Sequence, residues 1–132
     1  MGNSRYFVLV FGDPANNGDT LESERYEAEE RYPDFSAKPG DLLLLYCTEG
    51  YPGHSKQFYG IGVAIHTSPT LIEYRGISFK EPIPLRRSDE TFEPEDRKKM
   101  GNIRMSTYRA FEIDKQSFVR TVSGQKIEVA WD

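Results

Sequence analysis

The chain has 132 residues, of which 17 are lysine or arginine and 21 are aspartate or glutamate, giving a net charge of −4. This length is enough for one domain with a real core and short for two, so we predict a single domain over residues 1–132. The net negative charge argues against a protein that coats nucleic acid through bulk electrostatics, although it is compatible with a local basic groove. Eight acidic residues and only two arginines lie between Asp13 and Asp34, so the rest of the chain carries 15 basic residues against 13 acidic ones.

The chain has one cysteine, Cys47, so no disulfide can form within it. Its first residues lack the charged segment, long apolar core and small-residue cleavage site of a signal peptide. No apolar run is long enough to span a bilayer. We therefore expect a cytoplasmic protein with no membrane partner. Nothing in the sequence indicates the oligomeric state, and a monomer is assumed.

Three segments open the chain. Arg5 to Phe11 is rich in valine and aromatic residues and predicts a strand. Asp19 and Glu22 have the spacing of a capping box, which predicts a helix from Thr20 to Arg31 with a thin apolar stripe. From Gly40 to His66, two apolar runs flank a loop of Gly, Pro, Ser and His, which predicts two core strands joined by a polar loop.

The second of these core strands has one nearly bare face. Gly60, Gly62 and Ala64 alternate with the large side chains of residues 61, 63 and 65. Glycines on one face of a strand mark either a bend, as in a barrel, or the close approach of a backbone or ligand. The sequence favours the bend and leaves the ligand open.

The remaining chain continues this mixed pattern. Leu71 to Phe79 predicts a more exposed strand, and Pro82 and Pro84 then place Ile83 on a sheet edge or in an extended connection. The last predicted elements are a helix over Glu93–Gly101, a strand from Arg104, a short helix capped by Asp114 and reaching Phe118, and a closing strand around Ile127–Trp131. We predict an α+β, mainly β fold, a curved mixed sheet of about six strands or small barrel, flanked by short helices.

Reactive side chains give no strong signal. His54 and His66 have no partners at metal-ligand spacing, so we expect no metal. Cys47, His54 and Glu49 have the types of a thiol nucleophile, base and orienting group, but an inert buried cysteine is the commoner explanation. No glycine-rich phosphate loop or dinucleotide fingerprint is present, and we expect no cofactor.

Aromatic and basic residues form a more specific combination. Four aromatic residues surround the central loop, and the stretch from 97 to 111 has no acidic residue. Aromatic faces stack on bases and basic side chains contact phosphates. The predicted phosphate-contacting residues are Lys56, Arg97, Lys98, Lys99 and Arg109. The alternative, that these are ordinary strand residues and a solvated helix end, stays open.

The order of motifs resembles the EVE domain of the PUA-like superfamily. The resemblance is carried by Tyr6-Phe7, by Pro39-Gly40-Asp41 with its apolar run to Tyr46, by Gly60-Ile61-Gly62 with Ala64, and by Ile103-Arg104-Met105-Ser106. It spans nearly the whole chain and implies a PUA-like pseudobarrel. Relatives in this superfamily, including YTH domains, take a modified base of DNA or RNA into a pocket between the barrel and its loops.

The resemblance also implies the pocket residues. By position they are Phe11, Tyr46, Cys47, Thr48, His54, Ser55, Phe58, Arg104, Met105 and Ser106. Tyr46 or Phe58 would stack on an extruded base while Thr48 and Ser106 hydrogen-bond its edge. We therefore expect a non-enzymatic module, with no catalytic residues, whose partner is DNA or RNA.

Two alternatives stay open. One is an enzyme of the related ASCH-like group, a ribonuclease or amide hydrolase, in which Lys56, Tyr59 and Glu49 would act in the same cleft. A lysine acts as a base only where burial lowers its pKa. The chain also lacks the G-x-K-x-x-E-x-R pattern expected of ASCH domains. The other is a protein-interaction module that uses an exposed edge strand near Ile83.

Overall fold

The computed structural model describes residues 4–12, 21–27, 37–53, 55–68, 71–101, 110–123 and 127–128. The strands are β1 (Tyr6–Phe11), β2 (Arg25–Glu27), β3 (Leu42–Cys47), β4 (Gln57–Ser68), β5 (Leu71–Pro84), β6 (Ala110–Ile113) and β7 (Ile127–Glu128). The helices are the 3-10 turns η1 (Leu21–Ser23) and η2 (Leu85–Arg87), and α2 (Ser88–Thr91), α3 (Pro94–Gly101) and α4 (Lys115–Val122). Within the described residues no helix is long and apolar enough to cross a membrane.

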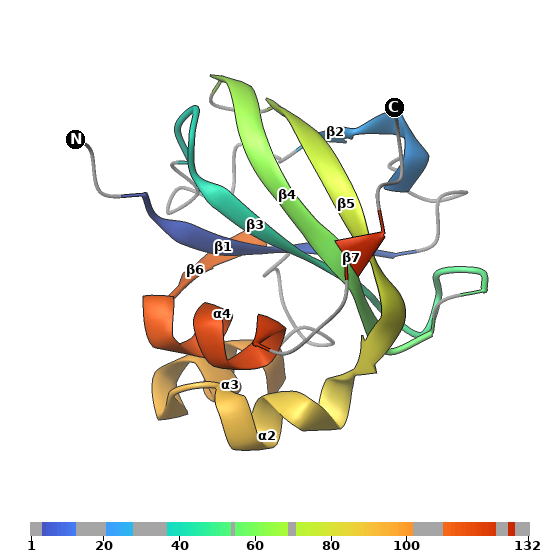
Figure 1. Ribbon diagram of the computed structural model, residues 1–132, viewed down its shortest axis with the longest axis vertical. Helices are drawn as coiled ribbons and strands as arrows, with labels where there is room; N and C mark the ends of the chain where they lie inside the picture. Colours follow the sequence, from blue (N-terminus) through green and yellow to red (C-terminus); the bar gives the residue numbers. More distant parts are fainter. Residues whose placement is uncertain are drawn as a thin grey trace.

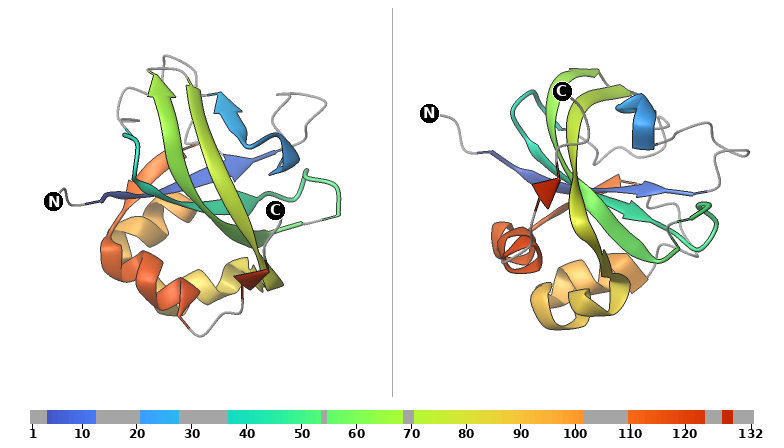
Figure 2. Two further views of the ribbon diagram at one scale, coloured as in Figure 1. Left: turned by 45° about the horizontal axis from the view of Figure 1, so that its top comes forward. Right: turned by 45° about the vertical axis from the view of Figure 1, so that its right-hand side comes forward.

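One curled mixed sheet forms a half-barrel with the helices gathered against one side (Figure 1). The strand order is β2-β5-β4-β3-β1-β6, with β7 added beside β5. β1 and β3 run parallel, and the other recorded pairs are antiparallel. The further views in Figure 2 show the same separation of the curled strands from α2, α3 and α4. The predicted mainly β, curved mixed sheet with short helices is confirmed.

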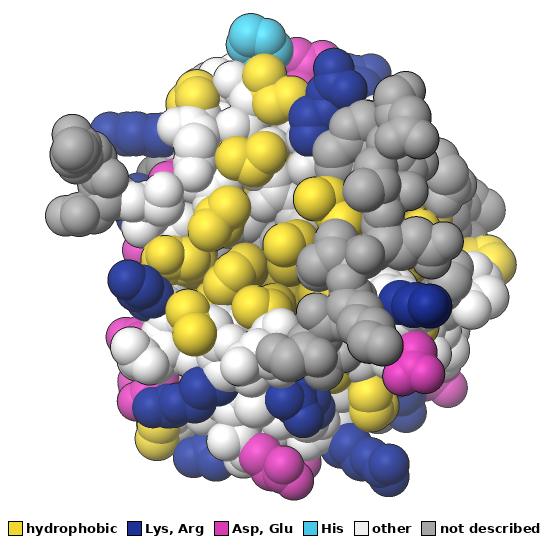
Figure 3. All heavy atoms as spheres, in the orientation of Figure 1, with side chains coloured by type: hydrophobic (Ala, Val, Ile, Leu, Met, Phe, Trp, Pro, Cys, Tyr) yellow, Lys and Arg dark blue, Asp and Glu magenta, His cyan; other side chains and the backbone are white. Residues whose placement is uncertain are grey.

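Strand alternation divides the core into two clusters. In β1 and β3 the odd-numbered residues, such as Leu9 and Leu45, face the barrel interior, and the even-numbered ones, such as Val8 and Leu44, face the helices. The central strands are therefore buried on both faces, which explains their uninterrupted apolar runs. Hydrophobic side chains gather on the face of the molecule shown in Figure 3. Among the described residues, the exposed large hydrophobic side chains are those of Val63 and Val119.

Gly60 and Gly62 lie where a side chain on β4 would collide with β5. A Cβ atom at Gly60 would stand 2.1 Å from the backbone oxygen of Ile77, and one at Gly62 would stand 2.8 Å from the ring of Tyr74. The pairing of β4 with both neighbours also shifts register around Tyr59. The bare face is thus filled by the neighbouring strand and its tyrosine, as expected for a bend and not for ligand approach.

The predicted helix from Thr20 to Arg31 is wrong over its described part. The chain makes one 3-10 turn, η1, passes through Glu24 at φ 54°, and enters β2. Tyr26 is fully buried, packs edge-on against Phe11 at 5.2 Å, and donates its hydroxyl to the carbonyl of Val10. Burial of this tyrosine and pairing with β5 outweigh a helix whose apolar stripe was thin.

Several other predicted elements agree with the structure. The strand from Leu71 extends to Pro84, and the predicted α3 and Asp114-capped α4 are confirmed, with the Asp114 carboxylate accepting from the Gln116 amide at 2.8 Å. Ile83 does not sit on an exposed edge, because it pairs with Phe58 and only 2% of it is accessible. Residues 104–109 and 129–131 of the predicted strands lie outside the described residues.

Candidate functional site

A cavity of about 720 Å³ opens at the carboxyl end of β3, beside the end of α3. It lies between the turn after β3, the start of β4, η2 and the last residues of α3. Its lining residues are Tyr46, Thr48, Glu49, Gly50, Lys56, Leu85, Met100 and Gly101. Its volume falls in the usual range of about 300–1,000 Å³ for small-molecule sites.

One wall of the cavity is apolar. Tyr46 faces the helix side of the sheet with only 3% of its surface accessible, and its ring is tilted against Phe58 at 5.1 Å. Met100 belongs to the same cluster and Leu85 packs against it, and both line the cavity. These side chains come from β3, η2 and α3, so the wall exists only once the helices have packed on the sheet.

The polar rim of the cavity is held by a tight turn. The Thr48 amide donates to the Phe11 carbonyl at 2.9 Å, and the Tyr51 amide donates back to the Thr48 carbonyl at 3.1 Å. The Gly50 amide donates to Thr48 Oγ1 at 3.3 Å. Glu49 therefore sits on a short turn whose two ends are both anchored.

Lys56 faces Glu49 across this rim. Its Nζ atom lies 4.0 Å from Glu49 Oε2, with 46% of the lysine side chain and 71% of the glutamate side chain exposed. A pair this open to water stabilises the fold by less than about 1 kcal/mol. Lys56 adopts φ 55°, and its carbonyl accepts the Leu85 amide at 3.0 Å, so its backbone is fixed even though its side chain is accessible.

The structure brings three of the predicted site residues to this cavity, Tyr46, Thr48 and Lys56. Phe11, Cys47 and Phe58 have no accessible surface and lie in the two core clusters, where they cannot touch a ligand in this conformation. Ser55 is exposed but does not line the cavity. The predicted residues outside the described part of the chain are His54, Arg104, Met105, Ser106 and Arg109.

The basic residues of α3 are directed elsewhere. Arg97 donates to the carbonyl of Asp89 at 2.9 Å, and Lys99 donates to the carbonyl of Glu112 at 2.9 Å. Lys98 pairs with Glu95 at 3.4 Å on the exposed side of the helix. Of the five predicted phosphate-contacting residues, Lys56 is the one that the described structure places on the cavity.

The geometry argues against both enzymatic alternatives. Cys47 is fully buried in the barrel cluster, as the inert-cysteine explanation requires. Lys56 and Glu49 meet at the cavity, but Tyr59 packs against the barrel cluster and is not among the lining residues. A lysine acts as a base where it is withdrawn from water, and nearly half of the Lys56 side chain is exposed.

Sequence reasoning missed Leu85, Met100 and Gly101. They lie far along the chain from Tyr46 and reach it through tertiary packing, so no local pattern indicated them. Gly101 did signal the end of a helix, but nothing in the sequence showed that this end faces the loop after β3.

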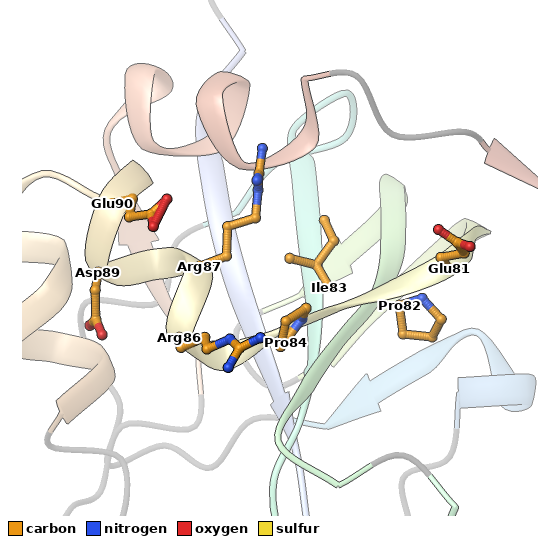
Figure 4. Close-up of a pocket in the computed structure, with 8 residues that line it drawn as sticks. All are labelled: Glu81, Pro82, Ile83, Pro84, Arg86, Arg87, Asp89 and Glu90. Atoms are coloured by element: carbon orange, nitrogen blue, oxygen red, sulfur yellow. The ribbon is translucent and has the colours of Figure 1, made fainter.

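A second cavity, of about 550 Å³, lies where β5 meets η2 and α2 (Figure 4). Its lining is Glu81, Pro82, Ile83, Pro84, Arg86, Arg87, Asp89 and Glu90, and includes none of the predicted site residues. Arg87 points toward α4, where its Nε donates to the Thr121 carbonyl at 3.4 Å. The charges of both signs and the buried Ile83 give this cavity no clear ligand class.

The half-barrel with its helices on one side has the PUA-like fold, the class to which ASCH and YTH domains belong. Solved structures with this fold include a protein of Rhodopseudomonas palustris, with a TM-score of 0.59 and 13% identity over 89% of this chain and 90% of that one. An ASCH protein of Zymomonas mobilis has a TM-score of 0.56 and 13% identity over 92% and 96% of the two chains. The YTH domain of Pho92 in complex with m6A has a TM-score of 0.54 and 14% identity over 100% and 92%.

No protein-family model matches the chain, and no curated protein matches it either. The likeness to solved structures at these identities shows the fold, and the EVE resemblance stays a prediction.

Proposed function

We propose that this domain binds nucleic acid and holds one modified or extruded base in the cavity at the end of β3. The observation that carries the proposal is that Tyr46, Thr48 and Lys56 meet at one cavity of about 720 Å³. An apolar wall, a hydroxyl and an ammonium are the groups that would contact a base face, a base edge and a phosphate. The shared fold with a YTH domain solved in complex with m6A supports the same reading.

The energetics set limits on this binding. Extruding a base costs a few kcal/mol, and stacking on an aromatic side chain returns about 1–3 kcal/mol. Only 3% of Tyr46 is accessible, so a base can contact only a small part of this residue and its contribution falls below that range. Contacts with Leu85 and Met100 and hydrogen bonds at the rim supply the rest, and a base that is already unpaired is favoured.

The test is a fluorescence anisotropy titration with short single-stranded DNA and RNA oligonucleotides, with and without modified bases, at low salt. We expect dissociation constants well below about 100 micromolar, the weak end of nonspecific affinity. No binding at that concentration would overturn the proposal. Hydrolysis of the RNA over hours without added metal would instead favour the ASCH-like enzyme.

Two substitutions locate the binding site. Lys56→Gln should weaken binding and reduce the slope of log K against log salt by about 0.7–0.9, the share of one phosphate contact. Lys38→Gln is the matched control, because it removes the same charge before β3, about 20 Å from Thr48 along a strand of six residues. An equal loss of slope in both variants would place the phosphate contact elsewhere.

Tyr46→Leu tests the aromatic wall. Leucine keeps most of the packing against Phe58 but removes the ring, so binding should fall while the domain stays folded. Circular dichroism checks the fold. Unchanged affinity in a folded variant would remove Tyr46 from the site.

A further inference from the structure

The 3-10 turn η2 forms the boundary between the two cavities. Leu85 lines the first cavity, whereas Arg86 and Arg87, the next two residues, line the second. The Leu85 amide donates to the Lys56 carbonyl at 3.0 Å, so η2 is tied to the residue that carries the cation of the first cavity. With standard backbone dimensions, this bond keeps the Cα atoms of Lys56 and Arg86 within about 11 Å of each other. Two basic residues are therefore close neighbours at this boundary.

The two arginines of η2 differ in their interactions. The Nε atom of Arg87 donates to the carbonyl of Thr121 in α4. Arg86 is exposed and makes no hydrogen bond or ion pair with another residue of the described chain. Its side chain extends toward Pro84 and away from Asp89 (Figure 4). All five N–H donors of the Arg86 guanidinium can thus serve a ligand.

The surroundings of Arg86 indicate which ligand it binds. A guanidinium binds the oxygens of a phosphate or carboxylate through two parallel hydrogen bonds. Glu81, Asp89 and Glu90 line the same cavity and repel a free anion, so this cavity taken alone is a poor anion site. A strand anchored in the first cavity presents its next phosphate to Arg86 at the high effective concentration that a short tether gives. The position of Arg86 therefore fits a contact with that strand and not with a separate ligand.

We propose that Arg86 binds a second backbone phosphate of the nucleic acid whose base occupies the first cavity, an inference that rests on the proposed function of that cavity. Lys56 and Arg86 contact the phosphates on the two sides of the held nucleotide, so the strand crosses η2 as it leaves the cavity. The backbone of η2 is fixed for this contact by the bond from Leu85 to Lys56 and by Ser88 Oγ, which donates to the Leu85 carbonyl at 2.8 Å. The ligand is then an oligonucleotide and not a single nucleoside.

The salt dependence of binding counts the phosphate contacts. Fluorescein-labelled single strands of about nine nucleotides, made of A, C or T as DNA and of A, C or U as RNA, are titrated by anisotropy, and the tightest binder is measured at several salt concentrations. Each phosphate contact with a single strand contributes about 0.7 to the slope of log K against log salt. Arg86→Gln should reduce this slope by about 0.7, and Arg86→Gln combined with Lys56→Gln should reduce it by about 1.4.

Two further variants separate a phosphate contact from general effects of charge and structure. Arg75→Gln removes the same charge from an exposed position on β5 that lines neither cavity, so it should leave the slope unchanged. Arg86→Lys keeps a positive charge on η2, so its slope should match that of the wild type. Arg86 is exposed, so both of its variants should stay folded, which circular dichroism checks.

The outcomes distinguish the two proposals. If no oligonucleotide binds the wild-type protein, both are overturned. If oligonucleotides bind but Arg86→Gln lowers the slope no more than Arg75→Gln does, the second phosphate contact is overturned while the proposed function stands. A slope that also falls in Arg86→Lys would show that the turn has changed, and it would overturn the contact as well. A loss of about 0.7 in Arg86→Gln that adds to the loss in Lys56→Gln supports the assignment.

Discussion

Replacing Gly60 with alanine should be the most damaging small change in the sheet. The added Cβ atom would lie 2.1 Å from the backbone oxygen of Ile77 and 2.8 Å from the Cα atom of Ser78, where ordinary contact begins at 3.4 Å. These are backbone atoms, so β4 and β5 must separate by about 1.3 Å at their bend. Overpacking of this kind costs about 1–3 kcal/mol, and a backbone clash belongs at the upper limit, about 3 kcal/mol.

Thermal unfolding followed by circular dichroism measures this cost. The unfolding entropy is about 2.1 cal/mol/K per residue, or about 0.28 kcal/mol/K for 132 residues, so Tm should fall by about 10 °C. Gly62→Ala should lower Tm less, because the added Cβ atom would stand 2.8 Å from the Tyr74 ring and 3.2 Å from its nearest backbone atom, the oxygen of Arg75. Gly101→Ala, with no atom within 4 Å at the end of α3, should be neutral or slightly stabilising. A Gly60→Ala variant as stable as Gly101→Ala would refute the assignment of Gly60 to strand contact.

Two further predictions concern polar contacts that hold the helices and the sheet edge. Asp96→Ala should lower the free energy of unfolding measured in urea by about 2–4 kcal/mol. The reason is that the buried Asp96 carboxylate accepts hydrogen bonds from Ser117 Oγ at 2.6 Å and from the Asp114 amide at 2.9 Å. A loss below about 0.5 kcal/mol would show that these hydrogen bonds do not hold the helices together. The hydrogen bond from Arg5 at 2.6 Å lowers the pKa of Glu112 from its ordinary 4.5. The ion pair therefore stabilises the domain fully above pH 4.5, and this stabilisation is lost as the pH falls through the lowered pKa of the folded state. Both side chains are more than a third exposed, so Glu112→Gln should lower the free energy of unfolding by only a few tenths of a kcal/mol near neutral pH and not at all in strong acid. A loss of stability that grows on acidification would contradict the predicted pH dependence.

The sequence predicted the sheet well where local composition and burial agree. The apolar runs of β1 and β3 are buried on both faces, and α3 and α4 begin and end at residues that favour helix termini. It failed at β2, where three residues are held in a strand by contacts of Tyr26 with distant parts of the chain. Single-sequence patterns carry no signal for such tertiary contacts.

The candidate site was predicted in part for the same reason. Tyr46 and Thr48 follow directly from the end of a recognisable strand, but the alternation of side chains changes at Tyr59, where the strand pairing shifts register. This shift leaves Phe58 in the core on the helix side of the sheet, although its place in the sequence next to the central loop suggested a pocket residue. The contribution of Leu85 and Met100 to the cavity wall became visible only in the folded structure, because tertiary packing brings them beside Tyr46.

The central position of β1 has a consequence for synthesis of the domain. Its parallel partner β3 begins at Leu42, and its antiparallel partner β6 ends at Ile113, a contact made across 107 residues of chain. β1 is therefore translated well before either neighbour exists, and its uncharged sequence YFVLVF has the character of an aggregation-prone segment until both edges are paired. Completion of the sheet waits for nearly the whole chain, so expression at low temperature or with chaperones should favour recovery of folded protein over fragments that stop before β6.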